Sequence, residues 1–535
     1  MEVEANYVDI VKREIYPARV KVADGKIASV ERVDKDFDSY LLPGFVDAHI
    51  HIESSMLPPS EFARLAVSHG TVATVSDPHE IANVLGIKGV QYMLDNSVQS
   101  PFKFYFGASP CVPATAFETN GATLGPEEIE QLLKMPQIKY LSEVMNFPGV
   151  INDDPDMLAK ISIAKKFGKA VDGHAPGLRG EDLQKYIDAG ISTDHEAFTY
   201  EEGLEKIQRG MKILIREGSA AKNFEALAPL ILDYPDMLMF CSDDRHPNDL
   251  ASEHINGHVK RAIAKGYDLF DVLKIACLNP VAHYGLDVGT LHVGDPADFI
   301  EVRDLKKFQL MQTVIGGNVV AKEAVSLIES VEVRTPNQFN ACLKKEEDFT
   351  LSRCKHTEVI HAIDHSLITE EEILDISSEK VEDILKIAVV NRYENKEVAV
   401  AFVHGFGLKK GAIASSVAHD SHNIIAVGCS DALMKKAVNT VIESRGGICA
   451  VSNEESRVLK LPITGLMSNQ DGFKVAKEYA ELDRIVKEEF SSTLSAPFMT
   501  LSFMALLVIP ELKLSDKGLF DGRSFHFIDN CGKKV

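Results

Sequence analysis

The stretch LLPGFVDAHIHIESS, residues 41–55, ends an apolar run with two histidines and a glutamate. Side chains of a β-strand alternate between its two faces, so His49 and His51 project to the same side of a strand. Paired imidazoles on one face are typical of a metal site, although a lone His-x-His also arises by chance in strands. The fold predicted for the residues that follow decides between these two interpretations.

The region after this stretch alternates apolar β-type runs with amphipathic helical patterns such as PSEFARLAVSHG and EDLQKYIDAG. Strands are predicted near residues 46–51, 71–76, 103–107, 139–144, 169–173, 191–195, 211–215 and 237–242. Eight strands that alternate with helices over about 245 residues match an α/β fold of the (β/α)8 TIM-like barrel type. A doubly wound open sheet is the structural alternative.

The regions on both sides of the barrel have a different pattern. Short strands and turns, as in ARVKVADGKIASVERV and GTLHVGDPADFIEVRDL, predict one small β-sandwich-like domain composed of residues 1–42 and 289–345. The barrel, residues 43–288, is then an insertion between these two pieces. A charged segment followed by strand-like runs such as VAVAFVHGFGL predicts a separate α+β C-terminal domain over residues 346–535.

Length and composition limit the classes of function. The 535 residues are 45% hydrophobic and 25% charged, which is ordinary for a globular chain with a large core. The formal net charge of -22 disfavours nucleic acid or an anionic membrane surface as the partner, and a neutral or cationic small molecule fits better. The N-terminal MEVEANYVDI lacks a basic segment followed by an apolar one, so no secretory signal is predicted and we expect a cytoplasmic protein.

Residues of metal-ligand type lie where the predicted strands end, and in such barrels these ends form the active-site rim. They are His49, His51, Glu143, His174, His195 and Asp243. Each has an ordinary structural explanation when taken alone, such as a helix N-cap for Asp243. Independent accidents rarely converge on one barrel face, and neutral imidazoles with two carboxylates suit two divalent ions about 3.5 Å apart. We therefore predict a binuclear metal site.

PGFVDAHIHIESS, the barrel layout and the late HVGDPADFI strand resemble the amidohydrolase superfamily of metal-dependent hydrolases. The motifs HIHIESS, VSDPHEIANV, SEVMNFPGV, DGHAPGL, STDHEA and CSDDRHP, with the C-terminal SSVAHDSHNIIAVG, are similar to those of the bacterial-type adenine deaminase family. The resemblance spans nearly the entire chain. It implies that Glu143 is a bridging ligand, where many superfamily members have a carboxylated lysine. The other metal ligands that it implies are His49, His51, His174, His195 and Asp243.

The resemblance also implies an activity, hydrolysis of adenine to hypoxanthine and ammonia by a metal-bridged hydroxide in purine salvage. It implies two divalent ions, in the first place Mn²⁺ or Fe²⁺, although imidazole and carboxylate ligands also tolerate Zn²⁺. The implied substrate is the small molecule adenine as the free base, and the chain is expected to self-associate as a homo-oligomer, in the simplest case a dimer.

Roles for individual acids follow from the chemistry of this reaction. We expect Asp243 to carry a proton from the attacking water to the departing amino group. A further acid should contact the ring nitrogen next to C6, with Glu80 in DPHE as the first candidate and Glu53 in HIESS as the second. A helix N-terminal position favoured by the macrodipole explains Glu80 equally well.

Several alternatives stay open at this point. Another amidohydrolase activity, on a cyclic amide or an N-acyl substrate, is compatible with the same metal cage. A non-catalytic barrel protein predicts an incomplete ligand set, whereas the set here is complete. His419, Asp420 and His422 in AHDSHN have no assigned role, since they are able to close the active site, bind another ion or anchor a turn. The Met- and Phe-rich stretch 492–512 is expected to be core or subunit interface rather than substrate pocket.

Overall fold

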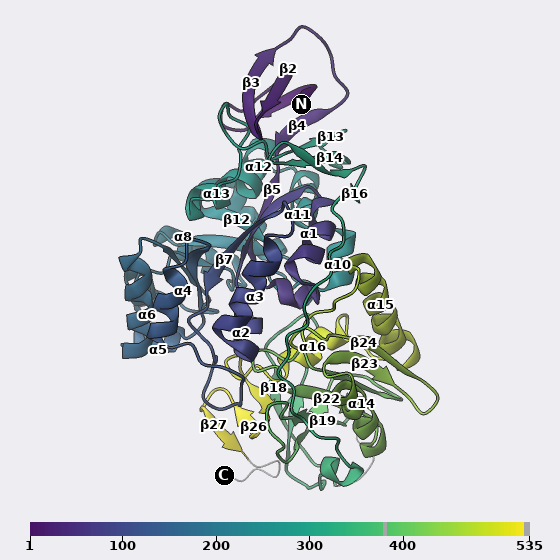
Figure 1. Cartoon of the computed structure of the whole chain (residues 1–535). Coiled ribbons are helices and arrows are strands. Elements are labelled where there is room, and N and C mark those ends of the chain that lie inside the picture. Colours follow the sequence, from purple (N-terminus) through teal and green to yellow (C-terminus); the bar gives the residue numbers. More distant parts are fainter. Residues whose placement is uncertain (378–381, 529–535) are drawn as a thin grey trace.

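Parallel strands β5 to β12 form a ring at the centre of the structure, a computed structural model that describes residues 1–377 and 382–528 (Figure 1). Their bounds are β5 (Phe45–Ile50), β6 (Thr71–Ser76), β7 (Lys103–Ala108), β8 (Ile138–Val144), β9 (Ala170–Gly173), β10 (Thr193–Asp194), β11 (Lys212–Arg216) and β12 (Leu238–Cys241). Strands β5 to β9 pair in sequence order, as do β10 to β12. Backbone hydrogen bonds join the two groups at both junctions: Ser192 N–H donates to Val171 O at 2.9 Å, and Asp243 N–H donates to His49 O at 3.0 Å. The ring is therefore a TIM-like barrel, not an open sheet.

The barrel strands begin and end within two residues of their predicted positions. Every residue of β5 and β6 is buried, as expected for parallel strands that helices cover. Local signals also set helix ends, as in α6 (Pro155–Lys166), where the Asp154 side chain accepts from Met157 N–H and proline occupies the first turn. The other helices of this region are α1 (Pro59–Val67), α2 (His79–Leu85), α3 (Ile87–Ser97), α4 (Pro126–Leu133), α5 (Phe147–Ile151), α7 (Gly180–Asp188), α8 (Tyr200–Gln208), α9 (Phe224–Leu227), α10 (Pro247–Ser252), α11 (Ile255–Ala264), α12 (Leu269–Leu273) and α13 (Asn279–Tyr284).

A sheet at one end of the barrel combines strands from before and after it, in the order β16-β15-β14-β13-β4-β1-β2-β3. Its strands are β1 (Glu2–Asp9), β2 (Glu14–Ala23), β3 (Lys26–Arg32), β4 (Tyr40–Pro43), β13 (Phe299–Val302), β14 (Leu310–Ile315), β15 (Asn318–Lys322) and β16 (Val325–Ser326). Asp24 and Gly25, with φ of 49° and 73°, make the predicted hairpin turn between β2 and β3. The antiparallel pairing of β4 with β13 joins the two pieces, so the chain enters and leaves the barrel side by side.

The C-terminal portion is built on a second sheet, in the order β18-β17-β20-β19-β22-β21-β23-β24. Its strands are β17 (Thr357–His361), β18 (Glu370–Leu374), β19 (Leu385–Val390), β20 (Ala399–His404), β21 (Ala412–Ser415), β22 (Ile424–Gly428), β23 (Gly447–Val451) and β24 (Ser456–Lys460). The remaining elements are α14 (Asp431–Glu443), α15 (Gly472–Arg484), α16 (Pro497–Phe503), β25 (Leu512–Ser515), β26 (Gly518–Asp521) and β27 (His526–Ile528). Apolar residues of α14 such as Met434 and Val438 are buried with sheet residues such as Val390 in one core cluster.

The C-terminal portion lies at the end of the barrel opposite the N-terminal sheet, as Figure 1 shows. Hydrogen bonds fix it there: Glu61 on α1 accepts from Gly472 N–H, and Met56 O accepts from Ser468 N–H, both at 2.8 Å. This end is the one to which the barrel strands point with their carboxyl ends, so the C-terminal portion faces the rim where the ligand-type residues lie. Within residues 1–377 and 382–528, no helix has the length and apolarity needed to cross a membrane.

Candidate metal centre

Glu143, near the end of β8, is the centre of the site. Its Oε1 atom lies 3.3 Å from His51 Nε2 and 3.3 Å from His79 Nδ1. Its Oε2 atom lies 2.8 Å from His174 Nδ1 and 3.2 Å from His195 Nε2. Each carboxylate oxygen thus faces its own pair of imidazole nitrogens. This is the arrangement expected of a carboxylate that two cations share.

Asp243, just beyond β12, also faces His51 and adds a further imidazole, His49, to the site. Its Oδ1 atom lies 3.2 Å from His51 Nε2 and 3.5 Å from His49 Nε2. The backbone of Asp243 is left-handed, with φ of 53°, a conformation that aspartate tolerates better than most residues. Because its N–H bonds to His49 O, the residue is fixed beside β5 where the ring closes. The fold therefore brings the first and last strands together at a ligand.

The other oxygen of Asp243 contacts a buried arginine that the sequence did not point to. Arg216, the last residue of β11, donates from Nη1 to Asp243 Oδ2 at 2.7 Å and binds both oxygens of Glu196. Burial alone would raise the pKa of Asp243, but the Arg216 guanidinium and two neighbouring imidazoles hold it well below its usual range. Asp243 is therefore an anion in the site.

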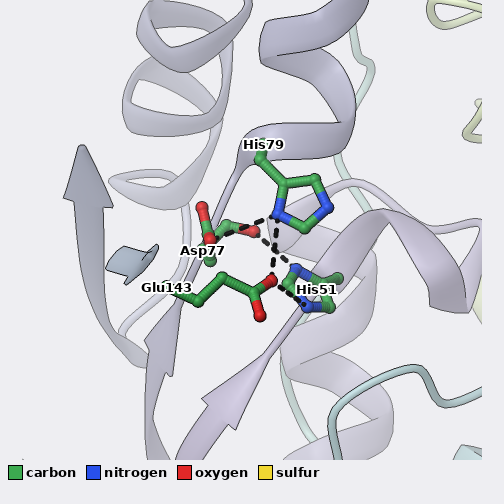
Figure 2. Close-up of side chains that lie close together, drawn as sticks. All are labelled: His51, Asp77, His79 and Glu143. Atoms are coloured by element: carbon green, nitrogen blue, oxygen red, sulfur yellow. Dashed lines mark hydrogen bonds and ion pairs between the residues drawn. The ribbon is translucent and has the colours of Figure 1, made fainter. Parts of the chain in front are cut away.

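Figure 2 shows His51, Asp77, His79 and Glu143 converging from the ends of neighbouring strands. The Nδ1 atom of His51 hydrogen-bonds to Asp77 O at 3.1 Å, which leaves Nε2 directed at the carboxylates. His79 Nδ1 lies 3.2 Å from Asp77 Oδ2 as well as facing Glu143. Sequence reasoning selected only Glu80 from SDPHE, although Asp77 and His79 immediately follow β6 and share its rim position.

All six residues predicted at the strand ends meet in this site, in overlapping groups whose donor atoms lie within 4.8 Å of one another. The groups are His49, His195 and Asp243; Glu143, His174 and His195; and His51, Asp77, His79 and Glu143. Buried carboxylates are in excess here: Asp77, Glu80, Glu143, Glu196 and Asp243. Among the described residues, Arg216 is the one lysine or arginine that lines the cavity. Divalent cations would balance this buried negative charge, so the donor set fits metal ions.

The C-terminal portion supplies the opposite wall of the site. Both oxygens of Glu80, in the first turn of α2, are bound by imidazoles, Oε1 by His419 Nδ1 and Oε2 by His422 Nε2. The His419 ring stacks on Phe503 of α16 with the ring centroids 4.5 Å apart. The AHDSHN motif thus closes the site over the barrel. The stretch 492–512 belongs to a buried core cluster, as expected, but its residue Phe503 also lines the cavity.

The pKa values of this wall follow from its charges. Burial opposes the charged forms of Glu80 and His419. The imidazoles of His419, His79 and His422 nevertheless hold the pKa of Glu80 well below its usual range. Burial likewise opposes protonation of His419, but the Glu80 carboxylate prevails and raises the pKa of His419 to about 9. Glu80 and His419 therefore form a charged pair at neutral pH.

Glu53, the second candidate for ring contact, is not among the described residues that line the cavity. After β5 the chain turns into a 3-10 helix over Ile52–Ser55, and Glu53 Oε1 accepts from Ile81 N–H at 3.1 Å. The alternation that directs His49 and His51 to one face ends with the strand, so it does not extend to Glu53.

The two walls enclose a small cavity. Its lining is polar on the barrel side and apolar on the C-terminal side, where it includes Leu367, Phe503, Leu506 and Ile509. A flat, partly apolar molecule with hydrogen-bonding edges fits such a lining.

Comparison with known proteins places both portions in described families. The model described as "Amidohydrolase family" matches residues 40–320, and the model described as "Adenine deaminase C-terminal domain" matches residues 362–526. The first range contains the barrel wall of the site and the second contains His419 and Phe503. Both walls of the cavity therefore lie within matched regions.

Relatives with the name "Adenine deaminase" match the chain over nearly its full length. The one from Sulfurovum sp. (strain NBC37-1) is 78% identical over 531 residues, which cover 99% of this chain and 100% of the relative. The one from Borreliella burgdorferi is 52% identical and covers 99% of each chain, and the one from Methanosarcina barkeri is 49% identical and covers 98% of each. The chain therefore belongs to the adenine deaminase family, within the amidohydrolase family.

Proposed function

We propose that this chain hydrolyses adenine to hypoxanthine and ammonia, as a step of purine salvage. The observation that carries the proposal is the two-sided cavity, in which the barrel supplies a metal-ligand cluster around Glu143 and the C-terminal portion supplies His419 and Phe503. Metal ligands alone would suit many amidohydrolases. The charged Glu80–His419 pair adds a hydrogen-bonding group for a basic purine, and the apolar wall adds a surface for its flat ring.

The proposed cofactors are two divalent ions, Mn²⁺ or Fe²⁺ in the first place, with Zn²⁺ also compatible with the ligands. Glu143 would be shared between them, and the other proposed ligands are His49, His51, His174, His195 and Asp243. When bound, such ions lower the pKa of a water molecule to near neutrality and so supply hydroxide at physiological pH. The chain's contribution is to hold the ligands and to keep the cavity closed to bulk water.

Asp243 is the proposed proton carrier. Arg216 fixes its Oδ2 atom, while Oδ1 faces the imidazoles of the site. Oδ1 would take the proton that the attacking water loses and pass it to the amino group that leaves C6 as ammonia. The Arg216 contact keeps the carboxylate in one orientation through both transfers.

Glu80 and His419 are proposed to act as a pair at the purine ring. Addition of water at C6 places negative charge on the neighbouring ring nitrogen, which then needs a proton or a hydrogen bond. Because Glu80 is held as an anion and the pKa of His419 is raised to about 9, His419 carries a proton on both ring nitrogens. Its Nδ1–H donates to Glu80 Oε1, whereas its Nε2–H has no hydrogen-bond partner among the described residues and is left for the ring nitrogen. His419 is the proposed donor, Glu80 the group that positions it, and Phe503 the apolar surface against the ring. Glu53 stays a weaker candidate for this contact.

Two further expectations belong to the same proposal. The chain would divide into a composite β-domain of residues 1–42 and 289–345, a barrel of residues 43–288 and a C-terminal domain of residues 346–535. The shared sheet of β4 with β13 supports the first of these boundaries. The chain would also form a homo-oligomer, in the simplest case a dimer, which light scattering during size-exclusion chromatography would measure.

The test is the absorbance change as adenine becomes hypoxanthine, on protein stripped of metal and then resupplied separately with Mn²⁺, Fe²⁺ or Zn²⁺. We expect at least one ion to restore turnover. His174→Asn should abolish it, whereas His292→Asn, at a half-exposed histidine beside Asp295 outside the barrel, should not. Adenosine and a hydantoin serve as competing substrates. Hydantoin hydrolysis without adenine turnover, in protein that binds two ions, would contradict the proposed substrate.

A further inference from the structure

A second cluster of histidines and carboxylates lies in the C-terminal portion, at one end of strands β17, β18 and β20. In the register of β17 with its neighbours, His361 is directly opposite Glu370 of β18 and His404 of β20. Residues two apart on a strand share a face, so Glu372 lies on the same side of the sheet as Glu370. The pairing thus gathers two imidazoles and two carboxylates on one face.

Glu372 lies between the two imidazoles. Its Oε1 atom is 3.3 Å from His361 Nδ1, and its Oε2 atom is 2.9 Å from His404 Nδ1. Glu370 Oε2 approaches the same His361 nitrogen at 3.1 Å. One donor atom from each of His361, Glu372 and His404 lies within 4.8 Å of the others. An ion with zinc-ligand distances of about 2.0–2.2 Å can contact three such atoms after small side-chain adjustments.

The cluster carries negative charge that its protein neighbours do not balance. Within residues 1–377 and 382–528, the ion pairs of Glu370 and Glu372 are with these two imidazoles alone. The nearby Arg523 pairs instead with Glu371, whose side chain points to the other face of β18. With neutral imidazoles, the two carboxylates leave two negative charges, which one divalent cation would cancel.

The exposure of the cluster suits an ion that binds from solution. The side chains of His361, Glu372 and His404 are 28%, 27% and 34% exposed. Their donor atoms are therefore accessible, while packing on the sheet restricts their movement. The apolar residues Val359 and Phe402, two positions earlier on the same face, form the floor next to the cluster.

We propose that His361, Glu372 and His404 bind one divalent transition-metal ion of the zinc class, with Glu370 as a fourth ligand. Imidazole and carboxylate are ligands that zinc takes in proteins, in tetrahedral sets of four. None of these four residues lines the cavity of the candidate metal centre. The site is thus separate from the two proposed catalytic ions and depends on neither.

The ion would act as a clamp on the sheet. β18 is the outer strand, and His361 and His404 lie on its first and second neighbours in the sheet. Ligands from all three strands would link the edge strand to the interior of the sheet. Without the ion, the edge strand is the part of the sheet that separates most easily. Because the unfolded chain lacks this geometry, the bound ion stabilises the folded C-terminal portion.

The test counts ions on the holoenzyme after equilibrium dialysis against micromolar ZnCl₂, with zinc, manganese and iron all measured by elemental analysis. Wild type is expected to hold one more ion per chain than Glu372→Gln or His404→Gln. Zinc is also expected to raise the Tm of wild type by about 5 °C at saturating concentration, and to have no such effect on either variant.

The controls separate this site from the catalytic one. His292→Gln removes a comparable histidine–carboxylate contact elsewhere and should keep the additional ion. Adenine turnover should be unchanged in Glu372→Gln and His404→Gln, which also shows that both variants fold. If wild type and both variants hold equal numbers of ions, the site does not exist and Glu372 is a hydrogen-bonded bridge only. Loss of the proposed function would appear differently, as absent turnover in wild type with the ion difference retained.

Discussion

Arg216 and Asp243 form a buried ion pair of 2.7 Å at the edge of the metal-ligand cluster. The contact uses one carboxylate oxygen of Asp243 and leaves the other, 3.2 Å from His51 Nε2, facing the site. Arg216 also binds Glu196, so one guanidinium neutralises two carboxylates away from solvent. Loss of this arginine would leave both buried anions without the guanidinium that neutralises them.

We therefore expect Arg216→Met to lower the free energy of unfolding by about 3–5 kcal/mol, as removal of one partner from a buried ion pair does. Turnover of adenine should fall as well, because Asp243 loses its fixed orientation. Thermal unfolding and steady-state kinetics measure the two effects. The matched control is Arg179→Met, at an exposed arginine paired with Glu205, which should change neither. Wild-type stability in Arg216→Met would contradict this account.

Asp243→Asn should keep the fold and lower kcat by at least about 100-fold, the smaller end of the range for loss of a general acid–base group. The amide preserves the shape of the side chain but cannot accept a proton. Metal content must be measured beside kcat, because Asp243 is also a proposed ligand. Asp233→Asn, at an exposed aspartate, is the control. Activity above a hundredth of wild type in metal-replete Asp243→Asn would rule out the proton-carrier role.

His419→Gln should lower kcat about 100-fold without loss of metal, because the variant removes the proposed proton donor and leaves the proposed ligands intact. The residue is 339 positions from Glu80 in sequence, so the effect would also establish that the C-terminal portion takes part in turnover. His365→Gln, at an exposed histidine in the same portion, should leave kcat unchanged. If kcat is unchanged in His419→Gln, the wall of the cavity from the C-terminal portion has only a structural role.

Removal of metal by a chelator should lower the Tm by about 2–3 °C for each ion, which corresponds to roughly 2.7 kcal/mol for an ion at a hundred times its Kd in a chain of 535 residues. The physical reason is the buried carboxylate excess around Glu143, which loses its balancing charge. Resupplied ions should restore the Tm and the adenine turnover together. A chelated protein with wild-type Tm would show that the site folds without cations. Differential scanning calorimetry with parallel elemental analysis provides the measurement.

Lys513 gives a pH dependence with a defined sign. Its side chain is fully buried on β25, donates to Leu367 O at 2.8 Å and Phe503 O at 3.1 Å, and burial lowers its pKa to about 7. The unfolded chain has an ordinary lysine pKa of about 10.4. Between these two values the unfolded state binds more protons, so the free energy of unfolding rises as pH increases.

Lys513→Met removes this dependence because methionine does not titrate. We expect the Tm of the variant minus that of wild type to be larger at pH 7 than at pH 9.5. Circular dichroism melts at both pH values give the two differences. Lys517→Met, at an exposed lysine four residues later, should show equal differences at both. Equal differences for Lys513→Met would mean that the buried amine keeps its ordinary pKa.

The ligand set of the barrel was predictable because local signals were enough to fix it. Alternation placed His49 and His51 on one face, and each strand of a parallel barrel delivers its carboxyl end to one rim. The strand ends alone therefore predicted that Glu143, His174 and His195 lie at one site, without any information on their contacts. Glu53 is the converse case: the 3-10 turn that follows β5 has no alternation, and the Glu53 carboxylate accepts a hydrogen bond from a helix N–H and does not line the cavity.

The wall from the C-terminal portion was not predictable in this way. Phe503 sits in an apolar stretch whose pattern is the same for a protein core and for a pocket lining. His419 and His422 meet Glu80 only through the packing of two separately built parts of the chain. Arg216 likewise has the pattern of an ordinary strand-end residue, and its role follows only from its contacts with Glu196 and Asp243. Contacts of this kind arise from tertiary packing, which single-sequence periodicity does not contain.

The contact of Glu80 with His419 also bears on when the protein becomes active during its synthesis. The barrel emerges from the ribosome before residue 419 is synthesised, and domains made first generally fold first. An unfinished chain would then carry an assembled ligand cluster with one wall of the cavity missing and Glu80 unpaired. Activity would appear only near the end of translation, so prematurely terminated chains would bind metal yet release no ammonia.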